Sequence, residues 1–322
     1  MKLLHLARAA GALIGWSLAF SVWAIGEKPV RLIVPAPPGG TIDIVARLLG
    51  QQMSTDLGRP VIVENRPGAG GSIGLQAMLQ AAPDGNTLVL AASNVLAETP
   101  QLMKMPFDPL KDVIPVGSVA RTGIVLVSAA SYPAKDFPSL MAELKTRKGK
   151  ASFASYSPGT VSQYAGLILN ERAGLDMQHV GYPGSPPALQ DILGGQVDIM
   201  FDGMVTSLPL IKAGKLRAYA FTGKARSRYL PDVPTATELG YPELQFRSWV
   251  GFMGSSKLAP DMLEKLRATI AKAAQVPAVQ QKLAEVGLEP ELIVDTPALM
   301  AETRALSERN AATVKKFRIE SN

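Results

Sequence analysis

From residue 30 onward, short apolar runs alternate with glycine- and proline-rich stretches and with longer segments of helical periodicity. The first unit has an apolar run at 30–34, a loop at 35–40 and a segment from Thr41 whose apolar residues keep the helical spacing until Gly58. The pattern then predicts strands at 61–64, 87–91, 123–127, 151–154, 178–180, 197–201 and 216–221, and helices at 73–81, 139–147, 161–173, 188–193 and 206–213. Strands that alternate with helices predict an α/β fold with helices on both faces of its sheets.

The last part of the chain has mainly helical periodicity, at 260–274, at 277–286 and from 297 towards 316. It offers too few strands for a third sheet, so we expect these helices to dock on the first domain. The chain would then cross between two domains twice, near 120–125 and near 246–251, and two crossings form a hinge. The predicted domains are 25–122 plus 248–322, a discontinuous domain 1, and 123–247, domain 2.

The first 24 residues are typical of a secretory signal peptide. Lys2 and Arg8 flank its start, an apolar run at 9–22 follows, and Val22 and Ala24 supply small residues before the expected cleavage site. The run is about 14 residues long, shorter than the roughly 20 of a membrane-spanning helix, so a retained membrane anchor is the less favoured alternative. After cleavage about 300 residues remain, enough for two domains, and we expect them to be free in the periplasm.

Composition narrows the function classes further. The chain has no cysteine and a net charge of +6. Without cysteine, an exported protein of this size depends on its hydrophobic cores and has no thiol for a lipid anchor or a metal. The densest basic run, at 145–150, has no interleaved aromatic residue and is typical of a solvated helix end, so we expect no nucleic-acid binding. A mildly positive surface raises the encounter rate with anions.

Three loops, at 37–41, 155–160 and 182–185, join a predicted strand to a predicted helix. In open α/β sheets, ligands bind at the carboxyl ends of the strands. These loops combine small residues, which expose backbone N–H groups, with hydroxyl side chains at a helix start, where free N–H donors and the helix dipole favour an anion. A carboxylate is therefore a candidate ligand. The alternative is that glycine and serine only form the turns, and Asp43 already places a negative charge at the first helix start.

Three further side chains stand beside the predicted cleft. Asn94 and Asp202 end strands, where they could orient the rest of a ligand or serve only as turn formers. Tyr182 could cover the ligand with its ring and donate its hydroxyl, or it could cover a domain edge.

Enzymatic and metal-binding interpretations have weaker support. The segment 70–74 matches the Gly-x-Ser-x-Gly nucleophile elbow, with Ser72 as nucleophile and His179 as a possible base, but several loop residues separate Ser72 from the preceding strand. Gly68 and Gly70 begin a dinucleotide fingerprint in which Ile73 replaces the third glycine. With no cysteine and one histidine after the signal peptide, a zinc site is not expected. We predict no catalytic residue, no metal and no cofactor.

Specific motifs follow one another over nearly the whole chain: VPAPPGG at 34–40, DIVAR at 43–47, VENRPGAGG at 63–71, APDG at 82–85, LGGQVD at 193–198, IKAGKLR at 211–217 and LPDVPT at 230–235. In this order they resemble the extracytoplasmic receptors of tripartite tricarboxylate transporters, the Bug receptors. The resemblance implies a type II periplasmic-binding-protein fold that closes on a small organic carboxylate and serves membrane permease subunits. We expect a monomer.

The resemblance also implies where the ligand binds. Backbone amides and hydroxyls of domain 2 would hold the carboxylate, with water linking it to domain 1. Carried over to this chain, the binding residues are Ser157, Gly159, Thr160, Ser162, Tyr182, Gly184 and Ser185, with Pro38, Gly39, Gly40, Thr41 and Asn94 opposite. The strand-end residue Asp202 completes the predicted set.

The chain departs from the family pattern at three places. Thr41 and Ile42 replace a small polar pair, Gln163 stands where histidine is common, and Pro183 replaces a basic residue. These departures favour a ligand with fewer charges or an apolar body. The alternatives to transport are a periplasmic sensory receptor for a carboxylate, a hydrolase built on Ser72, and nonspecific adhesion to polyanions.

Overall fold

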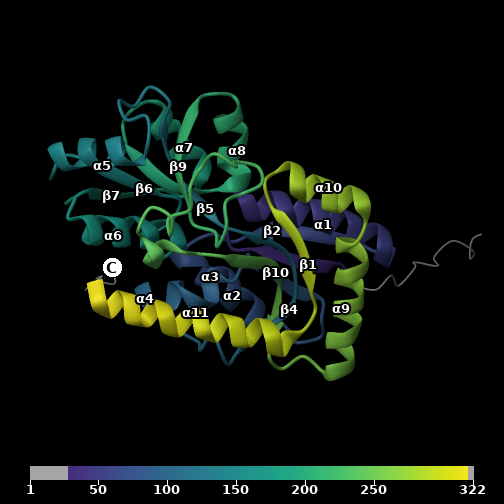
Figure 1. Cartoon of the computed structure of the whole chain (residues 1–322). Helices are drawn as coiled ribbons and strands as arrows, with labels where there is room; N and C mark the ends of the chain where they lie inside the picture. Colours follow the sequence, from purple (N-terminus) through teal and green to yellow (C-terminus); the bar gives the residue numbers. More distant parts are fainter. Residues whose placement is uncertain (1–27, 318–322) are drawn as a thin grey trace, which may run out of the picture.

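The computed structural model describes residues 28–317 and contains two separate β-sheets (Figure 1). The predicted signal peptide, 1–24, lies outside the described residues. The first sheet has the order β11-β4-β10-β3-β1-β2. Its strands are β1 (Val30–Val34), β2 (Val61–Asn65), β3 (Thr87–Ala92), β4 (Val113–Thr122), β10 (Ser248–Ser255) and β11 (Glu289–Ile293). Strands β1, β2 and β3 are parallel, whereas β10 runs antiparallel to β3 and β4.

The second sheet has the order β7-β6-β8-β5-β9. Its strands are β5 (Ile124–Ala129), β6 (Ser152–Ser155), β7 (Gln178–Gly181), β8 (Ile199–Gly203) and β9 (Leu216–Phe221). Here β6 is parallel to β7 and β8, and β5 is antiparallel to β8 and β9. All strands of the first sheet fall within 25–122 and 248–322, and all strands of the second within 123–247. The α/β class is confirmed, and the exact domain limits stay a prediction.

Helices cover both sheets (Figure 1). They are α1 (Thr41–Leu57), α2 (Ser72–Leu79), α3 (Asn94–Ala97), α4 (Thr99–Leu102), α5 (Phe137–Thr146), α6 (Val161–Ala173), α7 (Ser185–Leu193), α8 (Met204–Lys212), α9 (Pro260–Ala274), α10 (Pro277–Glu285) and α11 (Thr296–Phe317), with short 3₁₀ turns at Ala69–Gly71 and Pro242–Leu244. Gly58 and Gly174 end α1 and α6 in the left-handed conformation, with φ of 63° and 62°. None of the helices within 28–317 is long and apolar enough to cross a membrane.

The sequence pattern did not predict strands β4, β10 and β11. In β4 the apolar run is broken by Pro115 and Gly117, and it ends with the buried Arg121. Arg121 forms ion pairs with Glu291 of β11 and Glu302 of α11, so a charge that argues against a buried strand is paired by residues far along the chain. Pairing with these distant partners decides the strand.

The two segments that connect the domains lie side by side. Strand β4 passes into β5 through Gly123, and β10, its antiparallel neighbour, begins just after the returning segment. Thr222 joins both segments, because its hydroxyl accepts from the Ile124 N–H at 2.9 Å and donates to the Phe246 carbonyl at 3.1 Å. The two predicted crossings are therefore present and are tied together at one buried residue.

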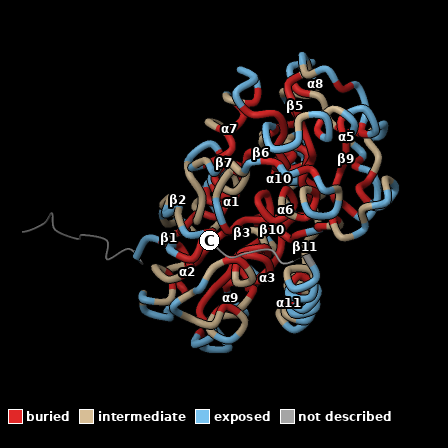
Figure 2. Tube along the Cα trace, turned by 90° about the vertical axis from the view of Figure 1, so that its left-hand side faces the viewer, coloured by how far each residue is buried: buried red, intermediate tan, exposed pale blue. Residues whose placement is uncertain are grey.

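The C-terminal helices dock on the first domain, as the pattern predicted, since α9 contacts α1 and β4, and α11 contacts β4 and α3. Helix α11 also reaches the second domain, where the Tyr164 hydroxyl of α6 donates to the Asn310 carbonyl at 2.9 Å. The sheets form the buried interior, and α11 exposes much of its outer side (Figure 2). This helix is thus a third, non-covalent link between the domains.

Candidate functional site

A cavity of about 630 Å³ lies between the two sheets. It is bounded by the loops that follow the carboxyl ends of β1, β3, β6, β7 and β8, the edge at which ligands bind in such sheets. Its first-domain wall contains Pro35–Pro37, Gly40–Ile42, the glycine-rich loop 67–71, Ala91, Ala92, Asn94, Val95 and Met103. Its second-domain wall contains Tyr156–Pro158, Thr160, Val161, Gly181–Ser185 and Gly203, and the connecting segments add Thr122–Ile124, Phe246 and Ser248.

Eight of the thirteen residues predicted from the sequence line this cavity: Gly40, Thr41, Asn94, Ser157, Thr160, Tyr182, Gly184 and Ser185. They come from loops separated by up to 145 positions, so the fold brings the predicted loops to one place. The lining residues Tyr156, Val95, Phe246 and Ser248 are not among the predicted site residues. Tyr156 lies inside one of the three loops predicted to carry the site, at 155–160, whereas the local sequence around the other three residues gives no such signal.

The other five predicted residues do not line the cavity. Pro38 and Gly39 are exposed, and the Gly39 N–H donates to Asp43 at 2.9 Å. The Gly159 N–H donates to the Gln163 side chain at 2.7 Å, and the Ser162 hydroxyl donates to the Phe201 carbonyl at 2.5 Å. These groups hold the loops in place, and Asp202 does so through a cluster of hydroxyls.

Asp202 is completely buried beneath the second-domain wall. One of its carboxylate oxygens accepts from the Ser185 hydroxyl at 2.6 Å, and the other accepts from Thr206 and Ser207, each at 2.6 Å. Burial raises the pKa of Asp202, and the three hydroxyl donors offset part of that rise. The carboxylate therefore fixes the starts of α7 and α8 and does not face the cavity.

The starts of α1 and α6 differ in charge. At α1, Asp43 stands in the first turn. Burial acts to raise the pKa of Asp43, but hydrogen bonds from Arg47, the Gly39 N–H and Asn65 outweigh it and lower that pKa overall. Asp43 therefore stays ionised and offsets the positive end of the α1 dipole.

At α6 the first turn has no acidic residue. The first hydrogen bond within this helix is from the Tyr164 N–H to the Thr160 carbonyl, at 3.0 Å, so the N–H groups of Val161, Ser162 and Gln163 have no acceptor inside the helix. Val161 and Thr160 line the cavity directly. Of these two helix starts, that of α6 therefore attracts an anion more strongly.

Most hydroxyl groups on the cavity wall already donate a hydrogen bond to another group of the protein. Thr160 donates to the Ser157 carbonyl at 2.5 Å, Ser157 to the Pro158 carbonyl at 3.2 Å, and Tyr182 to Asp191 at 2.6 Å. Together with Ser185, these side chains present oxygen lone pairs to the cavity in place of O–H donors. Donors for an anion must therefore come mainly from the backbone.

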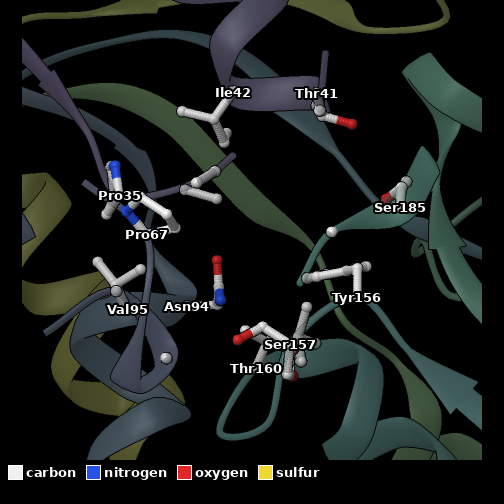
Figure 3. A pocket seen from close by; sticks show the side chains of 18 of the residues that line it. Pro35, Thr41, Ile42, Pro67, Asn94, Val95, Tyr156, Ser157, Thr160 and Ser185 are labelled. Carbon is white, nitrogen blue, oxygen red and sulfur yellow. Dashed lines mark hydrogen bonds between the residues drawn. The ribbon is translucent and has the colours of Figure 1, made fainter. Parts of the chain in front are cut away.

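Asn94 and Thr41 are different. Neither side chain has a hydrogen bond to another described residue. The Asn94 amide points into the cavity between the two walls (Figure 3). It is 6% exposed, and it offers both a donor and an acceptor to whatever fills the space.

The residues of the enzymatic alternative do not meet. His179 contacts the Ser155 hydroxyl at 2.7 Å and Gln163 at 3.3 Å, both in the second domain, and has no hydrogen bond to Ser72. Burial lowers the pKa of His179. Among residues 28–317, no group of three or more histidine and acidic side chains is placed to hold a metal ion.

Known proteins share this sequence and architecture. Residues 45–317 match the family model described as the tripartite tricarboxylate transporter family receptor. The protein BugT of Bordetella pertussis is 37% identical over 272 residues, which cover 84% of this chain and 83% of BugT.

Solved structures agree in fold. The structure of a periplasmic transporter superposes with a TM-score of 0.86 at 38% identity, covering 93% of this chain and 100% of that one. MatC from Rhodopseudomonas palustris, solved with bound malate, has a TM-score of 0.82 at 30% identity and covers 89% of this chain and 98% of MatC. The two-domain architecture is thus that of periplasmic binding proteins.

Proposed function

This chain belongs to the tripartite tricarboxylate transporter receptor family, and we propose that it is a periplasmic solute-binding protein. It captures a small carboxylate between its two domains, closes on it and delivers it to a membrane permease. The observation that carries the proposal is the cavity of about 630 Å³ with the uncompensated start of α6 on its wall. Malate bound to MatC supports a carboxylate as the ligand class.

In this proposal, backbone N–H groups supply the main hydrogen bonds to the ligand carboxylate. The ligand carboxylate accepts from the first-turn N–H groups of α6, and it lies against Ser157, Thr160, Gly184 and Ser185. Gly159, Ser162 and Asp202 act behind the wall by holding these loops, and Gly39 holds the first-domain loop through its hydrogen bond to Asp43. Gly40, Thr41, Asn94 and Tyr182 complete the enclosure.

The tight approach of the opposing loops supports the proposed domain closure. A β-carbon built on Gly184 would lie 2.5 Å from the Pro37 side chain, and one built on Gly203 would lie 2.6 Å from the Thr41 hydroxyl. Glycine at these points lets the two domains meet around the cavity. Such a closed arrangement excludes water and strengthens each hydrogen bond to the ligand. The closed form is the state that a permease would recognise.

The proposal is tested by titrating the protein calorimetrically with mono-, di- and tricarboxylates and with the corresponding carboxamides. Native mass spectrometry of protein purified without denaturation then identifies any ligand retained in the cavity. We expect one carboxylate per chain and no binding of its amide, because the amide lacks the charge that the α6 start attracts. If no carboxylate bound, or if amide and acid bound equally, the proposal would be wrong.

A backbone substitution tests the grip directly. Val161 is the first residue of α6 and follows an extended Thr160, so Val161→Pro removes one N–H donor at a position where proline is tolerated. Loss of a hydrogen bond to a charged group should weaken binding by about tenfold or more. Val161→Ala is the matched control, because it shortens the same side chain and keeps the N–H. Equal affinities of the two variants would exclude this donor.

A further inference from the structure

The cavity has two chemically different walls (Figure 3). Apolar side chains line the first-domain side, where Pro35, Pro67 and Val95 stand together and Ile42 closes the top in this view. The hydroxyl-bearing Ser157, Thr160 and Ser185 line the opposite side. A ligand with one polar and one apolar part therefore fits this lining.

No charged side chain lines the cavity among the described residues, because its lining contains no lysine, arginine, histidine, aspartate or glutamate. The nearest charges along the chain are already paired or satisfied. Asp43 is bound to Arg47 at 2.9 Å, and Asp202 is held by three hydroxyls. A second ligand carboxylate would find no cation on either wall.

Several backbone donors of the apolar wall are already used, and the N–H groups of Thr41 and Ile42, which have no acceptor inside α1, stand at a helix start whose charge Asp43 offsets. The Gly39 N–H donates to Asp43, the Gly40 N–H to the Pro37 carbonyl at 3.4 Å, and the Gly71 N–H to the Gly68 carbonyl at 3.0 Å. Pro35 and Pro67 have no N–H at all. A carboxylate pressed against this wall would exchange its hydration for a few uncharged donors, such as the Thr41 hydroxyl and the Asn94 amide, beside apolar side chains, which is unfavourable.

We propose, on the basis of the proposed function, that the ligand carries a single carboxylate and an apolar body. The carboxylate faces the start of α6, and the body, an alkyl chain or a ring, packs against Pro35, Pro67 and Val95. The Asn94 amide, between the two walls, contacts the boundary between the acid group and the body. A cavity of about 630 Å³ is in the size range of drug-sized ligands, so it has room for such a body.

The decisive experiment compares acids of equal length and different charge. Hexanoate and adipate both have six carbons, and they differ in the second carboxylate. Calorimetric titration should show hexanoate binding at least tenfold more tightly than adipate. In the series from butyrate to octanoate, each added methylene should tighten binding by up to about fourfold while the chain still contacts the apolar wall. Benzoate and cyclohexanecarboxylate test ring-shaped bodies in the same way.

The outcomes separate this inference from the proposed function. If adipate, malate or citrate bound as tightly as the best monocarboxylate, the inference of a single carboxylate would be wrong, whereas the proposal of a carboxylate receptor would still hold. If none of these acids bound, the proposed function would fall as well. If affinity did not change along the monocarboxylate series, contact of the body with the apolar wall would be excluded.

Two substitutions on one helix add a gain-of-function test. Ile42 lines the cavity, whereas Ile44, in the same first turn of α1, is 37% exposed and lies outside it. Ile42→Arg places a cation beside the apolar wall and should shift the hexanoate-to-adipate preference by at least tenfold towards adipate. Ile44→Arg is the control for the effect of a cation at this helix start, and circular dichroism verifies that both variants fold. Equal preferences in the two variants would contradict the assignment of the wall.

Discussion

Substitution of Gly203 by alanine tests whether contact between the two domains controls binding. Gly203 ends β8 and has φ of −68° and ψ of 144°, a conformation that alanine adopts without strain. Its added methyl group would lie 2.6 Å from the Thr41 hydroxyl oxygen of the opposite domain. The only close neighbour of that methyl group is thus a side chain across the cavity, so the substitution should act on the approach of the domains.

The expected size of the effect follows from the overlap. Ordinary contacts of a β-carbon begin at 3.4 Å, so the Thr41 hydroxyl must move by roughly 0.8 Å to accept the methyl group, either by rotation of its side chain or by separation of the two loops. Overpacking of this kind typically costs about 1–3 kcal/mol. If the cost falls on the ligand-binding conformation, the apparent affinity should decrease by about fivefold to 150-fold.

The assay is a double-mutant cycle with calorimetric titration of the best-binding carboxylate. Thr41→Ala removes the hydroxyl and leaves the two β-carbons 3.7 Å apart, an ordinary contact. Gly203→Ala should therefore weaken binding in the wild-type background and have little effect in the Thr41→Ala background. Small-angle scattering with ligand should show a larger radius of gyration only for the single Gly203 variant.

Two results would refute this reasoning. Unchanged affinity of Gly203→Ala would mean that the domains need not approach at this point. An equal loss in both backgrounds would mean that the methyl group occupies ligand space and does not separate the domains. Gly194→Ala is the control, because its added methyl group meets atoms only at 3.4 Å or beyond and Gly194 lies outside the cavity lining.

Two further predictions concern the junction of α11 with both domains. Burial raises the pKa of Glu98 to about 7, and Arg309 and Asn310 lower it only in part. In the unfolded chain Glu98 ionises near pH 4.5, so the free energy of unfolding should fall by about 3 kcal/mol as the pH rises from 4.5 to above 7. Urea unfolding at several pH values should show that Glu98→Gln removes this loss. If the variant kept the pH profile of the wild type, Glu98 would not be its cause. Tyr164→Phe leaves the Asn310 carbonyl without its 2.9 Å hydrogen bond and should lower the free energy of unfolding by about 1–3 kcal/mol. Amide hydrogen exchange should be faster in α11 of the variant. Equal stability of the variant and the wild type would show that this hydrogen bond does not hold the helix.

The pattern of the sequence predicted most of the elements because their causes are local. Helix α6 runs from Val161 to Ala173 and ends at Gly174, as the spacing of apolar residues and the glycine indicated. Strand β9 and helix α9 also have the predicted bounds. In each case the apolar period and the terminating residue lie within one short segment. The motifs that identify the family are likewise short and ordered along the chain.

The tertiary structure decided what depends on distant partners. Strand β10 sits between β3 and β4, and Arg121 of β4 is buried only because Glu291 and Glu302 neutralise it. Nothing near these residues in the sequence reveals the pairing. The sequence therefore determined the kinds of elements and their order, and long-range pairing determined the sheets.

The same division holds for the site. Serine and threonine in the predicted loops suggested hydroxyl donors, but Ser185 donates to Asp202 and Thr160 to the Ser157 carbonyl, so their protons are not free. The apolar wall comes from residues such as Pro35 and Val95, which are not close in sequence and share no motif. A residue type fixes which hydrogen bonds are possible, whereas only the packed neighbours fix which of them is made and which face of the side chain a ligand meets.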